Sequence, residues 1–314
     1  MSISAMRQAL QKISLFGLVL TYSTAHASTE DLVNIATSDA PVEIIKNKAK
    51  TLTLTAANQE IDSLENTALD HGWKHLDLSL GWENDKPTLT IMSVYGINET
   101  NNWFIFNQSS LVNYDNRNTL NLGIGARHIT DNETVILGTN AFYDYELESG
   151  HRRASIGVEA LTSMLEARAN HYSARSGVRT YKGINESALD GYDYSLKVIL
   201  PYTYSSNLYV KRSKWLDSIN YSSSIHEWGL EIAPIENLTM QLGSRSTDNA
   251  ASKLAATITY RMPFGHPKDS ATEKPNGNWS NSLKSVREKM YQPVQRENKI
   301  AKKALKLGLT VSGY

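Results

Sequence analysis

The sequence predicts an all-β fold: a 12-stranded antiparallel outer-membrane β-barrel with a C-terminal linker or helix that threads the lumen. Three observations lead to this fold class. Apolar and polar residues alternate with a period of two through most of residues 73–264. The alternating runs are mostly about nine to eleven residues long, the length that a tilted strand needs to cross a bilayer. An export signal precedes them, and no later segment has the roughly 20 apolar residues of a spanning helix.

The composition excludes several classes of function. The chain has 32 basic and 32 acidic residues and a formal net charge of +0. It therefore lacks the basic excess typical of proteins that bind nucleic acid, and we expect no nucleic acid among its partners. It contains no cysteine, which excludes disulfides, thiolate metal sites and cysteine nucleophiles.

Residues 1–27 are predicted to be a signal peptide. Two basic residues precede the apolar run ISLFGLVL, which is too short to be a membrane anchor. A small-x-small cleavage motif follows at Ala25 and Ala27, so Ser28 becomes the first mature residue. Residues 28–72 are then a polar periplasmic leader, whose second half predicts a short helix because apolar residues recur there at three-to-four spacing.

From residue 73 onward, alternating runs are separated by turn residues, which is typical of β-strands. The predicted strands span residues 73–82, 88–95, 103–113, 119–129, 134–147, 153–161, 165–174, 191–200, 207–215, 226–233, 238–245 and 253–264. Together they make residues 73–264 the predicted transmembrane barrel.

The lengths of the connections favour a membrane barrel over a soluble β-sandwich. Connections after the even-numbered strands are short, such as TDNE and TSM, whereas most others are longer, such as SGVRTYKGINESALD. Outer-membrane barrels have short periplasmic turns and longer outer loops, and a sandwich has no reason to show this alternation. An even number of strands also returns the chain to the periplasmic side at Phe264.

The polar faces of the predicted strands carry charged residues of both signs. We interpret these residues as the charge-paired lining of a lumen, because the opposite faces are apolar and suit lipid. They are Arg127, Asp144, Glu146, Glu159, Glu166, Arg168 and Asp193.

Residues 265–314 are predicted to be a linker with a helix that lies in the barrel lumen. Apolar residues recur at helical spacing over residues 279–290 and again over residues 295–307. The second stretch is cationic with a thin apolar stripe, which fits a lumen that contains acidic residues. A solvated periplasmic helix is the alternative that the charges alone favour.

Several stretches resemble the β-domain of the intimin and invasin adhesins, which are called inverse autotransporters. The stretches are FNQSSL at 106–111, NLGIGARHI at 121–129, LGTNAFYDYELESGHRRASIGVEA at 137–160, NHYSARSG at 170–177, GYDYSLKVILP at 191–201 and ITYRMPF at 258–264. The segment PVQRENKI at 293–300 resembles the linker that follows the barrel in this family. The linker residues that carry this likeness include Pro293, Arg296, Glu297 and Asn298.

The resemblance implies a 12-stranded barrel with a periplasmic amino terminus, a linker that threads the lumen outward, and a passenger at the cell surface. It also implies that Tyr260 and Phe264 form the end signal that the barrel assembly machinery reads. Two departures matter. The leader is too short for the peptidoglycan-binding module of some members, and no tandem immunoglobulin-like repeats follow the barrel. The adhesins contact their receptors through those repeats and the tip, so the resemblance does not extend to adhesion.

The sequence context of each motif that could indicate an enzyme or a cofactor site argues against that function. Gly123 and Gly125 form a GxG inside a predicted strand, so we interpret them as inward glycines that make room in the lumen. His71 and His75 are spaced i, i+4 without a third ligand. No GxSxG occurs. We predict no catalytic residue, cofactor or metal, although an outer-membrane hydrolase is kept as a third functional class.

The leading functional prediction is an outer-membrane translocator of intimin and invasin type in a Gram-negative bacterium. We expect it to export or display a passenger that is encoded separately, with a role in secretion and in virulence or host interaction, since this sequence ends about one linker after the barrel. The alternative is a truncated or minimal adhesin-type barrel that anchors at the surface without a separate passenger. The expected partners are outer-membrane lipid, the barrel assembly machinery and the secreted passenger.

Overall fold

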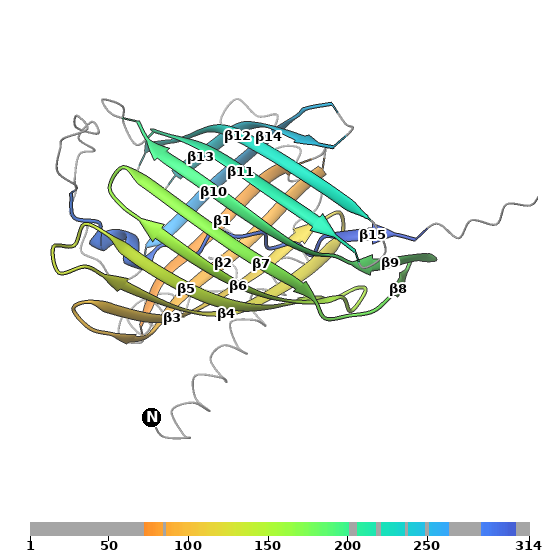
Figure 1. Cartoon of the computed structure of the whole chain (residues 1–314), viewed down its shortest axis with the longest axis horizontal. Coiled ribbons are helices and arrows are strands. Elements are labelled where there is room, and N and C mark those ends of the chain that lie inside the picture. The colour runs from red at the N-terminus through yellow and green to blue at the C-terminus, as the bar shows by residue number, and fades with distance from the viewer. Residues whose placement is uncertain are drawn as a thin grey trace, which may run out of the picture. The chain divides into compact units, whose positions relative to one another are not determined.

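Twelve strands close into one antiparallel barrel in the computed structural model of the chain (Figure 1). The structure describes residues 72–83, 86–200, 206–217, 221–235, 238–248, 251–263 and 284–305. The barrel strands are β1 (Trp73–Glu83), β2 (Lys86–Glu99), β3 (Trp103–Tyr114), β4 (Arg117–Ile129), β5 (Ile136–Glu146), β6 (Arg152–Leu161), β7 (Leu165–Ala174), β10 (Asp190–Ile199), β11 (Ser206–Leu216), β12 (Ser222–Ile235), β13 (Leu238–Thr247) and β14 (Lys253–Pro263). The predicted fold class is confirmed, and each predicted strand overlaps one strand of the barrel.

The predicted alternation of faces is visible in the burial of side chains along β3 to β7 and along β10. On β5, Asn140, Phe142 and Asp144 are buried, whereas the intervening Ala141 and Tyr143 are exposed. This period of two places one set of side chains in the lumen and the other on the outside of the barrel.

The barrel closes where the first strand meets the last. β1 pairs with β14 in a register that runs from His75 opposite Pro263 to Trp82 opposite Ala256. Tyr260 of the predicted assembly signal takes part in this pairing through its backbone, opposite Leu78. Phe264 lies outside the described residues, as do the predicted cleavage site at Ala25, Ala27 and Ser28, the leader helix, and His71.

The two ends of the barrel are named by their connections. We call the end with residues 100–102, 130–135 and 162–164 the turn end, and the end with residues 115–116, 147–151 and 175–189 the loop end. The predicted difference in length between them is only partly right. β1 and β2 are joined by residues 84–85 alone and β3 and β4 by 115–116 alone.

The short connections at the loop end have a local cause. Asp115 and Asn116 both have a positive φ, 55° and 58°, which is the geometry of a two-residue type I′ hairpin turn. The ladder therefore continues through polar residues that the sequence pattern assigns to a loop. Lys86 and Asp115 form an ion pair of 2.5 Å at the loop end.

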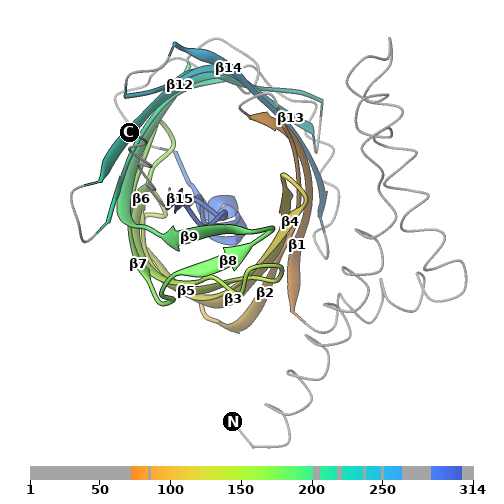
Figure 2. The same ribbon diagram turned by 90° about the vertical axis from the view of Figure 1, so that its right-hand side faces the viewer.

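A second, smaller sheet lies at the loop end and is not predicted by the sequence. It consists of the hairpin β8 (Arg179–Tyr181) and β9 (Ile184–Ala188) and the strand β15 (Lys302–Ala304), in the order β15-β9-β8. Viewed down the barrel, β8, β9 and β15 lie within the outline of the ring of strands (Figure 2). These strands are too short to show a period in the sequence.

The structure corrects the predicted helices of the C-terminal segment. In residues 284–305, which we call the tail, the only helical part is the 3₁₀-helix η1 (Arg287–Tyr291). Residues 295–301 form no regular secondary structure and bend at Arg296 and Lys299, and residues 302–304 form a strand. Residues 279–283 and 306–307 of the predicted helices lie outside the described residues. The reason is that side chains of the barrel wall bind the carbonyl groups that a helix would use. Arg153, for example, donates to the carbonyls of Glu297 and Lys299. Among the described residues, no helix is long and apolar enough to cross a membrane.

Candidate functional site in the barrel lumen

The tail contacts the inner side of the barrel from the turn end to the loop end. At the turn end, the Lys284 N–H donates to Ser163 Oγ over 3.1 Å. At the loop end, the Leu305 N–H donates to the Asn185 carbonyl over 2.7 Å. Between these two points, inward-facing side chains of the wall contact the tail in turn. The candidate functional site is therefore the lumen wall together with the tail.

Glu133, in the connection between β4 and β5, binds the start of the described tail. Its carboxylate accepts hydrogen bonds from Ser285 Oγ and from Arg287 Nε, each over 2.7 Å. Its carbonyl accepts the Val286 N–H over 2.8 Å. The hydrogen bonds from Ser285 and Arg287 hold the pKa of Glu133 below its usual range, so the side chain is a carboxylate at neutral pH.

A buried apolar cluster fixes η1 against the wall near the turn end. Val286, Met290 and Val294 of the tail are only 2–3% exposed. Burial of such side chains stabilises by about 1.5–3 kcal/mol each, which offsets the entropy lost when the tail is ordered. Their partners on the wall are Val94, Phe104, Phe106, Ile129, Ile136, Phe142 and Leu161.

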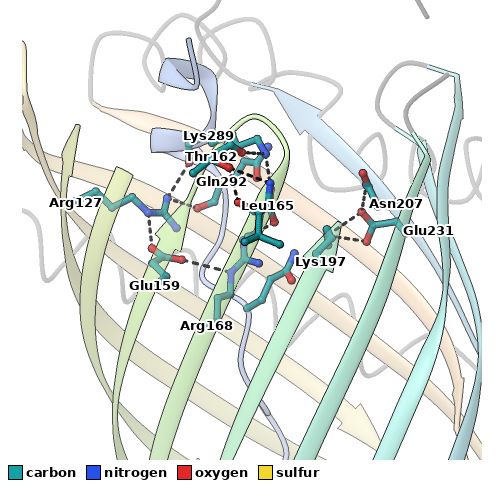
Figure 3. A network of polar contacts seen from close by, with 12 residues as sticks. Arg127, Glu159, Thr162, Leu165, Arg168, Lys197, Asn207, Glu231, Lys289 and Gln292 are labelled. Atoms are coloured by element: carbon teal, nitrogen blue, oxygen red, sulfur yellow. Dashed lines mark hydrogen bonds and ion pairs between the residues drawn. The ribbon is translucent and has the colours of Figure 1, made fainter. Parts of the chain in front are cut away.

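A chain of alternating charges connects β4, β6 and β7 to the tail (Figure 3). Arg127 Nε donates to Glu159 Oε1 over 2.6 Å, and Glu159 Oε2 lies 3.5 Å from Arg168 Nε. Arg168 Nη2 is 2.9 Å from Glu166 Oε2. The tail completes the series, because Lys289 Nζ donates to Glu166 Oε1 over 2.6 Å. The four wall residues are buried, so each charge depends on its neighbours for compensation.

A second charge cluster surrounds Asp144 on β5, deeper toward the loop end. Arg296 of the tail donates to both carboxylate oxygens, over 2.9 Å and 2.6 Å, and Arg153 Nε donates to Oδ2 over 2.8 Å. The guanidinium of Arg296 also lies over the Phe142 ring, 4.4 Å from its centroid. The side chains of Asp144, Arg153 and Arg296 are fully buried. Bidentate pairing between an arginine and a carboxylate is among the stronger hydrogen-bonded contacts in proteins.

Two arginines of the wall bind the backbone of the tail. The guanidinium groups of Arg127 and Arg153 donate to five tail carbonyls over distances of 2.5–3.4 Å. A carbonyl is present in every residue, so these contacts do not depend on which side chains the tail carries. The acceptors are the carbonyl oxygens of Lys289, Met290, Gln292, Glu297 and Lys299.

Gln108 on β3 adds a third contact of this kind. Its Oε1 accepts the Val294 N–H over 2.7 Å, and its Nε2 donates to the Val294 carbonyl over 3.2 Å. The side-chain amide thus pairs with the tail as a neighbouring strand would. Asn170 on β7 similarly donates to the Gln295 carbonyl over 3.3 Å.

Tyr172 and Asp193 form a polar bridge between β7, β10 and the tail. The Tyr172 hydroxyl donates to Asp193 Oδ2 over 2.6 Å and accepts the Glu297 N–H over 2.7 Å. Asn170 donates to the other oxygen of Asp193 over 2.8 Å. Asp193 therefore contacts the tail through Tyr172.

At the loop end the described tail includes the short strand β15. β15 pairs antiparallel with β9, and Lys302 forms an ion pair with Glu146 at the end of β5. Arg117 links Glu146 to the hairpin, with 2.7 Å to Glu146 and a bidentate contact of 2.6 Å and 2.9 Å to Glu186 on β9. The small sheet is thereby connected to the barrel wall beside the tail.

The residues predicted from the sequence lie in two groups. The predicted lumen charges are all buried on the inner face of the wall: Arg127, Asp144, Glu146, Glu159, Glu166, Arg168 and Asp193. Of the predicted linker residues, Pro293 is buried and Arg296 binds Asp144. Glu297 Oε2 lies 3.6 Å from Lys211 Nζ, and Asn298 accepts a hydrogen bond from Arg296 over 3.2 Å.

The wall residues that contact the tail but were not predicted as site residues include Gln108, Glu133, Arg153 and Tyr172. A signal existed for Gln108 and Arg153, because both are polar residues at inward positions of their strands. Glu133 lies in a turn and Tyr172 could equally face lipid, so neither stands out from its neighbours.

A polar cavity of about 910 Å³ lies beside the tail. Its lining includes Ser79, Lys211, Glu227, Glu231 and Arg245. Among the residues that the structure describes, no group of three or more His, Asp and Glu side chains is arranged to hold a metal ion.

The GxG glycines are inward residues, as predicted. A Cβ added at Gly123 would lie 2.2 Å from the Phe142 ring, and one at Gly125 would lie 2.3 Å from the Phe106 ring. Glycine is needed here because these rings project across the lumen wall to the tail.

Comparison with known proteins places these features in context. A family model described as "Inverse autotransporter, beta-domain" matches residues 24–298. Invasin of Yersinia enterocolitica is 28% identical over 181 residues, which cover 54% of this chain and 20% of that protein. A putative attaching and effacing protein homolog of Escherichia coli (strain K12) is 28% identical over 148 residues, 46% of this chain and 49% of that protein.

A chain solved in a study of the in-meso crystallization of membrane proteins shares the fold, with a TM-score of 0.65 and 20% identity. The match covers 74% of this chain and 100% of that one. This chain itself spans between a fifth and about half of the length of the two curated relatives.

Proposed function

The chain belongs to the inverse autotransporter β-domain family and forms a β-barrel of the outer membrane, and we propose that this barrel is a translocator that exports or displays a passenger polypeptide. The tail marks the route that the passenger takes through the lumen. The proposal contains no catalytic step.

The observation that carries the proposal is the continuous contact between the tail and the lumen wall. Much of this contact is made to backbone groups, by Arg127, Arg153 and Gln108. Backbone groups are the same in every polypeptide, so a wall that binds them can accommodate many passing sequences. A permanent plug would need only side-chain complementarity.

The proposed orientation follows from the direction of the tail. β1 begins and β14 ends at the turn end, and the tail runs from there to the loop end. In an exporter the turn end then faces the periplasm and the loop end faces the cell surface. The proposed partners are outer-membrane lipid, the passenger, and the barrel assembly machinery, which reads Tyr260 and Phe264.

The absence of cysteine allows a direct test of this orientation. Three single-cysteine variants of the full chain are placed at the turn end (Asp131→Cys), at the β8–β9 turn (Lys182→Cys) and on the emerging tail (Ala304→Cys). Intact cells are treated with a membrane-impermeant maleimide. We expect Lys182→Cys and Ala304→Cys to be labelled and Asp131→Cys to be labelled only after the outer membrane is opened.

Two outcomes would contradict the proposal. Labelling of Asp131→Cys in intact cells without Lys182→Cys would mean the opposite orientation. Labelling of Lys182→Cys while Ala304→Cys stays protected, even though Ala304 is exposed at the loop end, would mean that the tail does not leave the lumen in cells.

The predicted separate passenger requires its own experiment. Deletion of the gene should remove a neighbouring exported protein from the culture supernatant or the cell surface, and re-expression should restore it. Unchanged secretion of every such protein would favour the alternative, a minimal adhesin-type barrel that anchors at the surface without a separate passenger.

A further inference from the structure

A basic patch lies on the outward face of the barrel, toward the loop end. On the same strands, the outward residues closer to the turn end are apolar and exposed, such as Leu208 and Val210 on β11 and Trp228 on β12. The change from apolar to basic therefore occurs at one level of the wall. The patch consists of His171 on β7, Tyr192 and Tyr194 on β10, Arg212 and Lys214 on β11, and His226 on β12.

The strand register makes the patch contiguous. Residues directly paired across neighbouring strands have Cβ atoms about 4.5–5.5 Å apart, so their side chains form common rows. One row is Tyr194, Arg212 and His226, and the next row toward the loop end is His171, Tyr192 and Lys214.

The two cationic side chains of the patch, Arg212 and Lys214, are not neutralised by ion pairs within the described structure. Arg212 and Lys214 form no ion pair with a described carboxylate at contact distance. Asp248 interacts electrostatically with Arg212 and His226, but its carboxylate accepts the Ser224 N–H over 2.6 Å. A second acid, Asp190, lies on the outward face of β10 two residues from Tyr192, and its carboxylate accepts the Ala174 N–H over 2.7 Å. Arg212 and Lys214 are in ion pairs with neither acid, whereas the described inward-facing arginines, such as Arg127 and Arg153, are paired.

We propose that the basic patch binds the phosphate-bearing headgroup of a lipid with a net negative charge in the leaflet at the loop end. A charge on the lipid-facing wall is destabilising at the bilayer midplane and is tolerated near the interface, which is the level of headgroups. Guanidinium and ammonium groups recognise phosphate, the first through a bidentate fork. The two tyrosines complete the site, because their rings suit the boundary and their hydroxyls can donate to phosphate oxygens.

The binding is measured by native mass spectrometry of the full chain in a neutral detergent. The protein is titrated with phosphatidylglycerol and, separately, with phosphatidylcholine. We expect a clear preference for phosphatidylglycerol. In the double variant Arg212→Gln/Lys214→Gln, affinity for phosphatidylglycerol should fall about fivefold for each charge removed, more than tenfold in total, while binding of phosphatidylcholine stays the same.

A matched control removes the same charge at the same end, away from the patch. Lys86→Gln/Lys182→Gln changes β2, across the ring from β11, and the β8–β9 turn. This control should keep the wild-type preference. Heat-modifiable mobility on a denaturing gel verifies that each variant is a folded barrel. The variant Arg212→Lys preserves the charge and should retain most of the affinity even if glutamine at this position disturbs the wall.

Three results would each overturn the proposal. The first is equal affinity of the wild-type protein for the two lipids. The second is a loss in the control as large as that in the patch variant, which would indicate a general effect of net charge. The third is displacement of the lipid by millimolar inorganic phosphate, which would mean a site for free phosphate and not for a lipid.

Discussion

The two halves of the lumen wall use charged residues differently. From β3 to β7, inward side chains contact the tail directly, as Arg127 and Arg153 do through its carbonyls. From β10 to β13, they pair chiefly with one another beside the cavity of about 910 Å³. Lys197, for example, contacts both oxygens of Glu231 over 2.8 Å and 2.9 Å.

This difference shows that residue type alone does not decide what a charge in the lumen does. Arginine, lysine and glutamate occur in both halves, and the alternation of inward and outward residues is the same. What differs is whether a tail backbone group or tail side chain lies within reach. We therefore distinguish a packed half, β3 to β7, from an open half, β10 to β13.

The largest expected effect is at the centre of the packed half. Asp144→Asn removes the carboxylate between Arg153 and Arg296 and leaves two buried guanidinium groups without their counter-charge. We expect the free energy of unfolding to fall by about 3–5 kcal/mol. Urea unfolding in detergent micelles, followed by tryptophan fluorescence, measures this. A loss below about 1 kcal/mol would mean that the packed half does not depend on its charges.

The next effect separates the charge of an arginine from its geometry. Arg127→Lys keeps the positive charge near Glu159 but loses the fork that also reaches the carbonyls of Met290 and Gln292. We expect a loss of about 2–3 kcal/mol, because a shorter, single ammonium group leaves acceptors without a charged donor. The same unfolding assay measures it. If lysine proved fully equivalent, the binding of the tail backbone would contribute little.

A third variant tests packing in the same half without touching a charge. Gly123→Ala would place a Cβ 2.2 Å from the Phe142 ring. The guanidinium of Arg296 stacks over this ring. We expect a loss of about 1–2 kcal/mol from overpacking. The double variant Gly123→Ala/Phe142→Leu, with a smaller side chain opposite, should recover part of that loss. An unchanged unfolding midpoint for the single variant would show that Phe142 can move freely.

The matched experiment in the open half should have a smaller effect. Lys197→Met/Glu231→Met removes both members of an ion pair that lies beside the cavity and joins two strands of the wall. Removal of both partners leaves no uncompensated charge, so we expect a change within about 1 kcal/mol. A loss as large as that of Asp144→Asn would abolish the distinction between the two halves.

The smallest effect concerns pH at the loop end of the packed half. Burial lowers the pKa of His151, although the carboxylates of Glu186 and Glu146 oppose the shift. The unfolded chain therefore binds a proton more readily than the folded one. Stability should be full above about pH 6.5 and fall as the pH drops toward the lowered pKa.

Urea midpoints at pH 7.5 and pH 5.5 check this expectation. The urea midpoint of the wild-type protein should be lower at pH 5.5 than at pH 7.5. The midpoint of His151→Gln should decrease less over the same change of pH. Equal changes in both proteins would show that other groups cause the pH dependence.

The sequence by itself determined the barrel and the inner face of its wall. Period-two alternation is a local property, so it located every barrel strand and placed residues such as Asp144 and Glu159 in the lumen. The same alternation of inward and outward positions predicted that Gly123 faces the lumen. The lengths of the turns were less well predicted. Asp115 and Asn116 form a two-residue hairpin turn, whereas the polar residues around them predicted a longer loop.

Only the tertiary structure decided what the lumen residues bind. Arg296 meets Asp144 because the closed barrel brings the tail beside β5, and no local pattern contains a contact between residues so far apart in the sequence. Over residues 295–305, the predicted helical spacing was outweighed for the same reason. An isolated helix satisfies its own carbonyls, but here Arg153 donates to them from the wall, and residues 302–304 form a strand that pairs with β9.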